Sequence, residues 1–337
     1  MRHHMKHRMK HHMNRLTLWA VMLLACCAGT ASSTAVAQNY PARAVRIVVP
    51  FPPGAATDIL GRLLAQKLTE AWGQPVVIDN KPGAGSIIAA ETAAKSPADG
   101  YTIFMGHIGT HGANPALYSR LPYDPVQDFA PVTLLVTIPN LIAVHPALPA
   151  GNIRELIDLA RAKPGTLNVA SPGVGTSAHL NIALFKSLTG TDLTHVPFKG
   201  SVAAMQAVVG GDVQVAFDTV TTILPQARAG KVRVLAVSSK ERAPLAPDAP
   251  PLNEAGVPGF DVSTWFAFFV PAGTPRAIID KINAGTVRVL QSKDMAERAQ
   301  ALGMNIAAGT PEQLAAHVSS EIARWGKVVR EANIRIE

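Results

Sequence analysis

The chain is poor in cysteine and in aromatic residues. Only two cysteines, Cys26 and Cys27, occur among 337 residues, and 5% of the residues are aromatic. Because we expect the segment that holds both cysteines to be removed, the remaining chain has no disulfide, no thiolate metal site and no cysteine nucleophile. After this segment no stretch of the ~20 residues that cross a membrane is free of glycine, proline and charge. We therefore expect a soluble mature protein.

The formal charge of +8 does not indicate a nucleic-acid-binding protein. Residues 1–37 carry five of these charges, on Arg2, Lys6, Arg8, Lys10 and Arg15, and contain no acidic residue. By subtraction (8 − 5), residues 38–337 carry only +3. With 48% hydrophobic and 16% charged residues, the chain is also unlike a disordered protein.

The N-terminus has the features of a secretory signal peptide. A basic segment, Met1–Arg15, precedes an apolar run, Leu16–Ala28, and the small residues Ala35-Val36-Ala37 follow. This order predicts a signal peptide over residues 1–37, cleavage after Ala37 and a periplasmic protein. An alternative is a lipoprotein site, since Leu23-Leu24-Ala25-Cys26 would allow lipidation of Cys26.

The mature chain alternates β-rich runs with helical ones, which predicts an α/β fold with mostly parallel sheets covered by helices on both faces. About 300 residues are long for one such sheet, so two lobes are expected. The predicted strands are Val45–Pro50, Val76–Ile78, Ile103–Met105, Leu141–Val144, Leu167–Ala170, Val213–Phe217, Val232–Val237 and Trp265–Val270. The predicted helices are Ile59–Leu68, Ile153–Ala162, Ser177–Leu188, Val202–Val209, Arg276–Gln291 and Pro311–Ala332.

Two loops of small residues occupy matching places. Phe51–Asp58 and Ser171–His179 each connect the end of a predicted strand to the start of a predicted helix. Free backbone amides and the helix dipole make such a position favourable for an anion. One loop in each lobe would form a two-sided clamp on a carboxylate. The alternative is a pair of ordinary turns that use glycine for its conformational freedom.

Motifs of common enzymes and metal sites are missing. The chain contains no phosphate-binding loop, no complete dinucleotide fingerprint and no G-x-S-x-G elbow. His107 and His111 have helical metal-site spacing, but they follow a predicted strand and we expect a loop there without a metal. His179 is expected to pack on or hydrogen-bond the second loop, and Asp58 to cap its helix. Asp218, after an apolar run, could accept an amine or hydroxyl of a ligand or hold a hinge.

With these residues in view, the sequence closely resembles the tripartite tricarboxylate transporter substrate-receptor family, also called Bug or TctC-like proteins. The resemblance covers Tyr40–Glu337 and depends on motifs that follow one another in order. They are Tyr40-Pro41, VVPFPPGAATD (48–58), DNKPGAG (79–85), DGYT (99–102), NPALY (114–118), LPYDPVQDFAPV (121–132), ASPGVGTSAHL (170–180), HVPFKGS (195–201), STWFAFFVPAGTP (263–275) and WGKVV (325–329).

The resemblance implies a type II periplasmic-binding-protein fold, with lobe 1 at 38–139 plus 264–337 and lobe 2 at 140–263. It also implies which residues hold a ligand carboxylate, in part through ordered waters. They are Phe51, Ala55, Ala56 and Thr57 from lobe 1 and Ser171, Gly175, Thr176 and Ser177 from lobe 2, to which we add Asp218. Two positions depart from the family, because Ala55 and Ser86 stand where glycine is common.

These observations favour a binding protein over an enzyme. The expected function is capture of a small organic carboxylate in the periplasm and its delivery to the membrane permease subunits of a tripartite tricarboxylate-type transporter, with no cofactor and no metal. An alternative is a sensor that presents its closed form to a membrane signalling protein. A secreted α/β enzyme is a third possibility, but no nucleophile–base pair can be assembled from the sequence.

Overall fold

The computed structural model describes residues 40–331 and 334. The predicted signal peptide, its cleavage site and the alternative lipidation of Cys26 lie outside the described residues. The first strands form a parallel set in the order β2-β1-β3, and helices cover them. The elements are β1 (Val45–Val49), α2 (Ala56–Trp72), β2 (Val76–Asn80), η1 (Ala84–Ser86), α3 (Ile87–Ala94), β3 (Thr102–His107), η2 (Gly109–Ala113) and α4 (Asn114–Leu117).

A second parallel set, in the order β7-β5-β6, forms the other part of the molecule. Its elements are α5 (Ile153–Ala162), β5 (Asn168–Ser171), α6 (Ser177–Thr189), β6 (Thr194–Pro197), α7 (Ser201–Val209), β7 (Val215–Thr219), α8 (Val220–Arg228) and β8 (Arg233–Val237). Below, "the β1 region" means β1–β3 with α2–α4, and "the β5 region" means β5–β8 with α5–α8.

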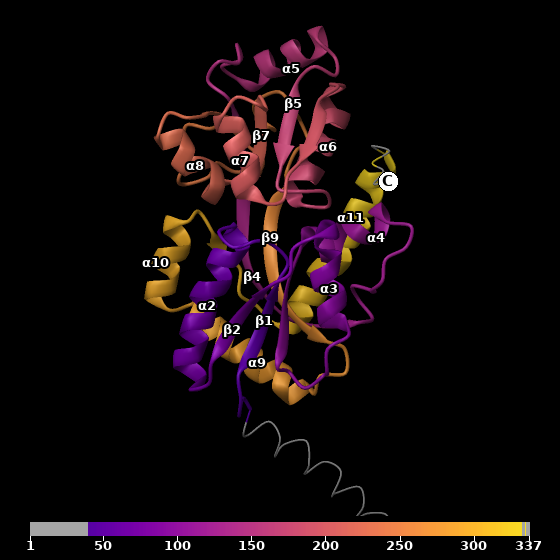
Figure 1. The fold of residues 1–337 in the computed structure, drawn as a ribbon, viewed down its shortest axis with the longest axis vertical. Coiled ribbons are helices and arrows are strands. Elements are labelled where there is room, and N and C mark those ends of the chain that lie inside the picture. Colours follow the sequence, from indigo (N-terminus) through magenta and orange to yellow (C-terminus); the bar gives the residue numbers. More distant parts are fainter. Residues whose placement is uncertain (1–39, 332–333, 335–337) are drawn as a thin grey trace, which may run out of the picture.

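Two long strands connect the regions, as the ribbon in Figure 1 shows at its centre. β4 (Phe129–Val144) pairs with β9 (Ser263–Pro271) as far as Pro139, and from Asn140 onward it pairs with β7. The chain then returns to the β1 region through α9 (Arg276–Leu290), α10 (Lys293–Ala301), β10 (Asn305–Ile306) and α11 (Pro311–Glu331).

The connecting strands correct the prediction of mostly parallel sheets. Four pairings are parallel, all within the two regions, whereas β3–β9, β4–β7, β4–β8, β4–β9 and β4–β10 are antiparallel. The α/β alternation correctly predicted the parallel units. It could not show that strands crossing between the units run against them, because a crossing strand has no crossover helix to mark its direction.

All eight predicted strands and six predicted helices overlap observed elements. The sequence pattern missed α3, α4, β6, α8, α10, β10 and the first part of β4. The causes are local. α8 contains Pro225, an interior residue that weakens a helical pattern, and β6 is a half-polar run of four residues. By contrast, the stripe Leu60, Leu64 and Leu68 of α2 is fully buried against the sheet, as its spacing predicted.

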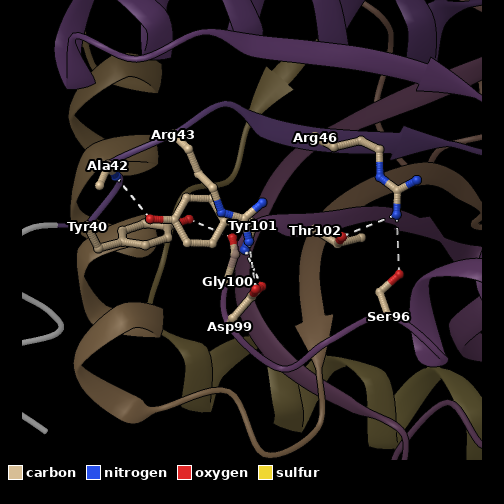
Figure 2. Close-up of polar contacts among 9 residues, drawn as sticks. All are labelled: Tyr40, Ala42, Arg43, Arg46, Ser96, Asp99, Gly100, Tyr101 and Thr102. Carbon is tan, nitrogen blue, oxygen red and sulfur yellow. Dashed lines mark hydrogen bonds and ion pairs between the residues drawn. The ribbon is translucent and has the colours of Figure 1, made fainter.

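The start of the described chain is fastened beside the loop before β3 (Figure 2). The Tyr40 hydroxyl donates to the carbonyl oxygen of Gly100 at 2.6 Å, and Arg43 forms an ion pair with Asp99 at 2.8 Å. The Arg43 guanidinium also lies 3.8 Å from the centre of the Tyr101 ring. Among the described residues, no helix has the length and apolar character needed to cross a membrane.

Candidate functional site

A narrow cavity of about 30 Å³ lies where the N-termini of α2 and α6 meet the crossing strands. This volume corresponds to about two water molecules. Its lining combines residues from both regions: Phe51, Ala55, Ala56, Thr57, His107, Pro172, Thr176, Ser177, Ser201, Asp218, Thr219, Thr264 and Phe266. Seven of the nine predicted site residues are therefore together at one place; Ser171 and Gly175 are not in the lining.

The N-terminus of α2 has no side-chain cap. Ala55 occupies the N-cap position, and its methyl group cannot accept a hydrogen bond from the first amides of the helix. The predicted capping role of Asp58 is wrong in detail, because its carboxylate accepts from the backbone N–H of Gly54 at 3.0 Å and not from a helix amide. Arg62 and Asn80 also donate to it, at 2.9 and 3.0 Å. Asp58 thus fixes the loop and leaves the first amides of the helix without a side-chain cap.

Asp58 is a buried carboxyl that stays ionised. Burial by itself would raise the pKa of this carboxyl, but the hydrogen bonds from Arg62, Gly54 and Asn80 outweigh burial and lower the pKa. The side chain is 3% exposed and remains ionised next to the cavity. Its charge is balanced by Arg62 one helical turn later.

The second loop has its hydroxyl groups already engaged. Thr176 caps α6 by accepting from the N–H of His179 at 3.3 Å, and it donates to the carbonyl oxygen of Gly173 at 2.7 Å. Ser177 shares a 2.5 Å hydrogen bond with Thr264 of β9, and Thr264 donates to Asn140 of β4 at 2.8 Å. Ser177 therefore joins the end of α6 to both crossing strands.

Ser171 and Gly175 support this loop from behind the cavity. The buried Ser171 hydroxyl is 2.6 Å from Nε2 of His195, and the N–H of Gly175 donates to Nδ1 of His179 at 3.3 Å. The latter contact confirms the predicted packing of His179 on the loop. The two imidazole rings stack at 4.5 Å. Burial lowers the pKa of His179 to about 4 and that of His195 to about 3, so both rings are neutral at pH 7.

The Ser171–His195 contact corrects the expectation that no nucleophile–base pair can be assembled. The pair exists in the fold, but neither residue lines the cavity and Ser171 is fully buried. A histidine whose pKa is near 3 is also a weak base at neutral pH. The pair therefore stabilises the loop structure and has no access to a substrate in this conformation.

His107 belongs to the site and was considered in the sequence only as a metal ligand. It ends β3, and the segment after it is the helical turn η2, not the predicted loop. Nδ1 of His107 accepts from the N–H of Gly109 at 3.0 Å, so Nε2 carries the proton and faces the hydroxyl of Ser86 at 2.9 Å. Burial lowers the pKa of His107 to about 3. His111 stacks on Phe269 at 3.7 Å, away from any metal partner.

Ser86 shows why glycine is common at its position in the family. Its φ of 72° lies in the left-handed region, which costs a residue with a Cβ about 1 kcal/mol or more. The hydrogen bond to His107 offsets part of this cost. No three side chains of His, Cys, Asp or Glu converge anywhere in residues 40–331 and 334 in a way that would hold a metal ion.

Asp218 is the most unusual residue of the lining. It lies in β7, is 4% exposed, and its Oδ1 accepts from the N–H of Thr219 at 2.7 Å. Its Oδ2 has no hydrogen-bond partner in the described part of the chain. Burial raises the pKa of this carboxyl to about 6, although the nearby N–H of Thr219 and the hydroxyls of Ser201 and Thr222 oppose the rise.

A larger cavity of about 810 Å³ adjoins the narrow one and shares Phe51, Pro172 and Thr176 with it. Lys199, within the family motif at 195–201, lines this larger cavity. Ser201, Thr219, Thr264 and Phe266 were missed as lining residues. Three of them, Ser201, Thr264 and Phe266, fall inside the family motifs at 195–201 and 263–275, which was the signal available.

The two regions touch at the rim of these cavities. A Cβ built on Gly85 would lie 3.2 Å from the carbonyl oxygen of Val174, and one built on Gly54 would lie 3.6 Å from Val202. A Cβ on Gly109 would overlap the carbonyl oxygen of Gly175. Glycines of the β1 region thus allow the β5 region to approach closely.

Comparison with known proteins agrees with this geometry. The model of the tripartite tricarboxylate transporter family receptor matches residues 60–334. The structure of Rpa4515 of R. palustris with adipate is 38% identical, with a TM-score of 0.85 and coverage of 88% of this chain and 100% of that one. MatC of Rhodopseudomonas palustris with bound malate is 38% identical, with a TM-score of 0.82 and coverage of 86% and 100%. The periplasmic binding protein BugD is 33% identical, with a TM-score of 0.83 and coverage of 88% and 100%.

The three structures each cover 86–88% of this chain. They confirm the predicted α/β fold, which is that of periplasmic binding proteins of the TctC and Bug type. They also agree with a binding receptor, because the matching family model describes a receptor and not an enzyme. The chain belongs to the receptor family of the tripartite tricarboxylate transporters.

Proposed function

We propose that this protein is an extracytoplasmic receptor that captures a small organic carboxylate and delivers it to the membrane subunits of a tripartite tricarboxylate-type transporter. The observation that carries the proposal is the narrow cavity at which the N-termini of α2 and α6 meet. Both helix ends direct backbone amides and the positive end of a dipole toward it, and this favours an anion. The family to which the chain belongs supports delivery to a transporter rather than to a signalling protein.

The ligand carboxylate binds in the narrow cavity against Phe51, Ala55, Ala56 and Thr57 on one side and Thr176 and Ser177 on the other. Ser171 and Gly175 hold the second loop in shape. Room for about two water-sized groups fits the two oxygens of a carboxylate, and the rest of the ligand extends into the adjoining cavity of about 810 Å³. Malate in MatC and adipate in Rpa4515 support the carboxylate class.

Binding and release require the two parts of the molecule to separate. We assign lobe 1 to residues 38–139 plus 264–337 and lobe 2 to residues 140–263. The change of partner of β4 between Pro139 and Asn140 supports a hinge at this point. The ligand contacts both lobes, so it stabilises the closed form over the open one, and the closed form docks on the permease. The predicted signal peptide places the receptor in the periplasm.

A thermal-shift screen of residues 38–337 tests the binding function. The panel holds mono-, di- and tricarboxylates, amino acids and aromatic acids, with the corresponding primary amides and alcohols as uncharged controls. A ligand at 100 times its Kd adds about 2.7 kcal/mol of stability, so a clear rise in Tm is expected with one class of acid. Calorimetry then gives the Kd. If denatured protein releases no retained ligand and no acid raises the Tm, the proposal is wrong.

A further inference from the structure

Asp218 places an unpaired carboxylate oxygen in a cavity that the two helix ends prepare for an anion. Its side chain is 4% exposed, and its backbone pairs with Leu141 of the neighbouring strand, so the carboxylate cannot move out to water without disturbing the sheet. Oδ1 is held by the N–H of Thr219, while Oδ2 has no partner among the described residues. A buried polar atom without a hydrogen-bond partner destabilises the folded protein, and such atoms are rare in native structures.

The hydroxyls of Ser201, Thr219 and Thr222 lie near the Asp218 carboxyl and lower its pKa, but Oδ2 still has no hydrogen-bond partner among the described residues. His107 is the other titratable side chain of the lining, and its two ring nitrogens already contact Gly109 and Ser86. The hydroxyl of Thr264 donates to Asn140. Arg62, the cation nearest in the chain to the first loop, forms its ion pair with Asp58 and is absent from the lining. Oδ2 is therefore open to a donor that the ligand brings.

The size of the cavity limits where the ligand carries this donor. About 30 Å³ has room for little more than the two oxygens of a carboxylate, so a donor that reaches Asp218 has to be attached next to the carboxylate. A plain carboxylate would bring its own negative charge close to that of Asp218 and would leave Oδ2 unpaired. A hydroxyl or ammonium group next to the carboxylate separates the two charges and donates to Oδ2, and an ammonium group also compensates the charge.

We propose, building on the receptor function above, that the ligand is a 2-substituted carboxylate with a hydroxyl or ammonium group beside its carboxylate, and that Asp218 is the residue that selects this group. The family likeness does not decide the point, since at 38% identity one similar structure holds malate and another holds adipate. In this chain Asp218 makes the unsubstituted acids the weaker ligands.

Calorimetry with three matched sets of acids tests the selection. The sets are butyrate, succinate and adipate, each with its 2-hydroxy and 2-amino derivative. In the wild type we expect at least one substituted acid to bind about tenfold or more tightly than its unsubstituted parent, because the parent leaves a buried carboxylate unpaired. The control variant Asp212→Asn changes an exposed aspartate of the same region and should keep this ratio.

The variant Asp218→Asn should reduce the ratio to about threefold or less. Its amide oxygen accepts from Thr219 as Oδ1 does now, so its NH2 group takes the place of Oδ2 and no longer repels a plain carboxylate. A ligand hydroxyl can accept from this NH2 group, whereas an ammonium group cannot. A large loss of absolute affinity therefore identifies an amino acid as ligand, and a small loss identifies a hydroxy acid.

Two results would overturn the selection without affecting the receptor function. One is that parent and substituted acids bind equally well at all three chain lengths. The other is that Asp218→Asn keeps the full ratio of the wild type. If no acid of any set binds to the wild type, the receptor function itself fails and this inference fails with it.

Discussion

At the scale of the residue, Asp218 illustrates a conflict between binding and stability. In the folded protein its pKa is raised to about 6 because the carboxyl is buried, whereas the unfolded value is 3.8. Between these values the folded state holds a proton that the unfolded state has lost. The stability that this proton gives the folded state is fully present below pH 3.8 and is lost as the pH rises through 6. Asp218 thus costs no more than about 3 kcal/mol at neutral pH.

The variant Asp218→Asn should therefore stabilise the ligand-free protein at neutral pH. Its gain in the free energy of unfolding over the wild type should be small at pH 4.5 and should grow to about 1–3 kcal/mol at pH 7.5. Urea unfolding of both proteins at several pH values measures the difference. The buried histidines titrate in both proteins and cancel, and Asp212→Asn serves as the control. A difference independent of pH would contradict the assignment.

At the scale of the element, the start of α6 combines a helix cap with the wall of the cavity. The Thr176 hydroxyl caps the helix and closes the loop onto Gly173, and Ser177 fastens the same turn to Thr264. Because both hydroxyls are engaged within the protein, they keep the amides of the loop in position. The α2 end instead depends on Asp58 to hold its loop.

The double variant Thr176→Ala with Ser177→Ala should weaken both functions of this turn. Loss of the cap costs about 0.5–2 kcal/mol in unfolding free energy. Affinity for the best acid of the screen should fall by some tens of fold, because the loop amides lose the position that the two hydroxyls give them, and a hydrogen bond to a charged group is worth about 1.5–3 kcal/mol. Calorimetry and thermal unfolding measure the two effects. Thr166→Ala, in the exposed loop before β5, is the control, and unchanged affinity in the double variant would remove this turn from the site.

At the scale of the whole molecule, the proposed closure depends on how closely the β1 region and the β5 region can approach each other. Gly109 in the β1 region lies against the carbonyl oxygen of Gly175 in the β5 region. Thr221 of α8 also donates to the carbonyl oxygen of Leu302, which follows α10, at 2.6 Å. A close backbone approach and a hydrogen bond therefore both connect segments that the proposed hinge would separate.

The variant Gly109→Ala should act as a wedge between the regions. Its methyl group would overlap Gly175 in the closed form, and His107 would have to shift beside it. We expect affinity to fall about tenfold or more and the radius of gyration with saturating acid, from small-angle scattering, to exceed that of the wild type. Gly112→Ala in the same turn is the control, because its Cβ would lie 3.3 Å from Trp325 of α11 and does not face the β5 region. A compact, tightly binding Gly109→Ala protein would show that this contact does not limit closure.

The sequence by itself determined the local units of this protein. The β-branched run at Val45–Val49, the leucine stripe of α2 and the small-residue loops at 51–58 and 171–179 depend on neighbours a few residues away, so their patterns predicted the strand, the helix and the two turns. The order of the motifs predicted the family for the same reason, because each motif is a local run of residues.

The tertiary structure alone decided which of these residues share one cavity. His107, Asp218 and Thr264 come from three strands, and only the crossing of β4 and β9 brings those strands together. It also placed Ser171 behind the loop and left Oδ2 of Asp218 without a partner. Burial and long-range contact are properties of the packed chain. No pattern along the sequence indicates which buried polar side chain is left without a hydrogen-bond partner.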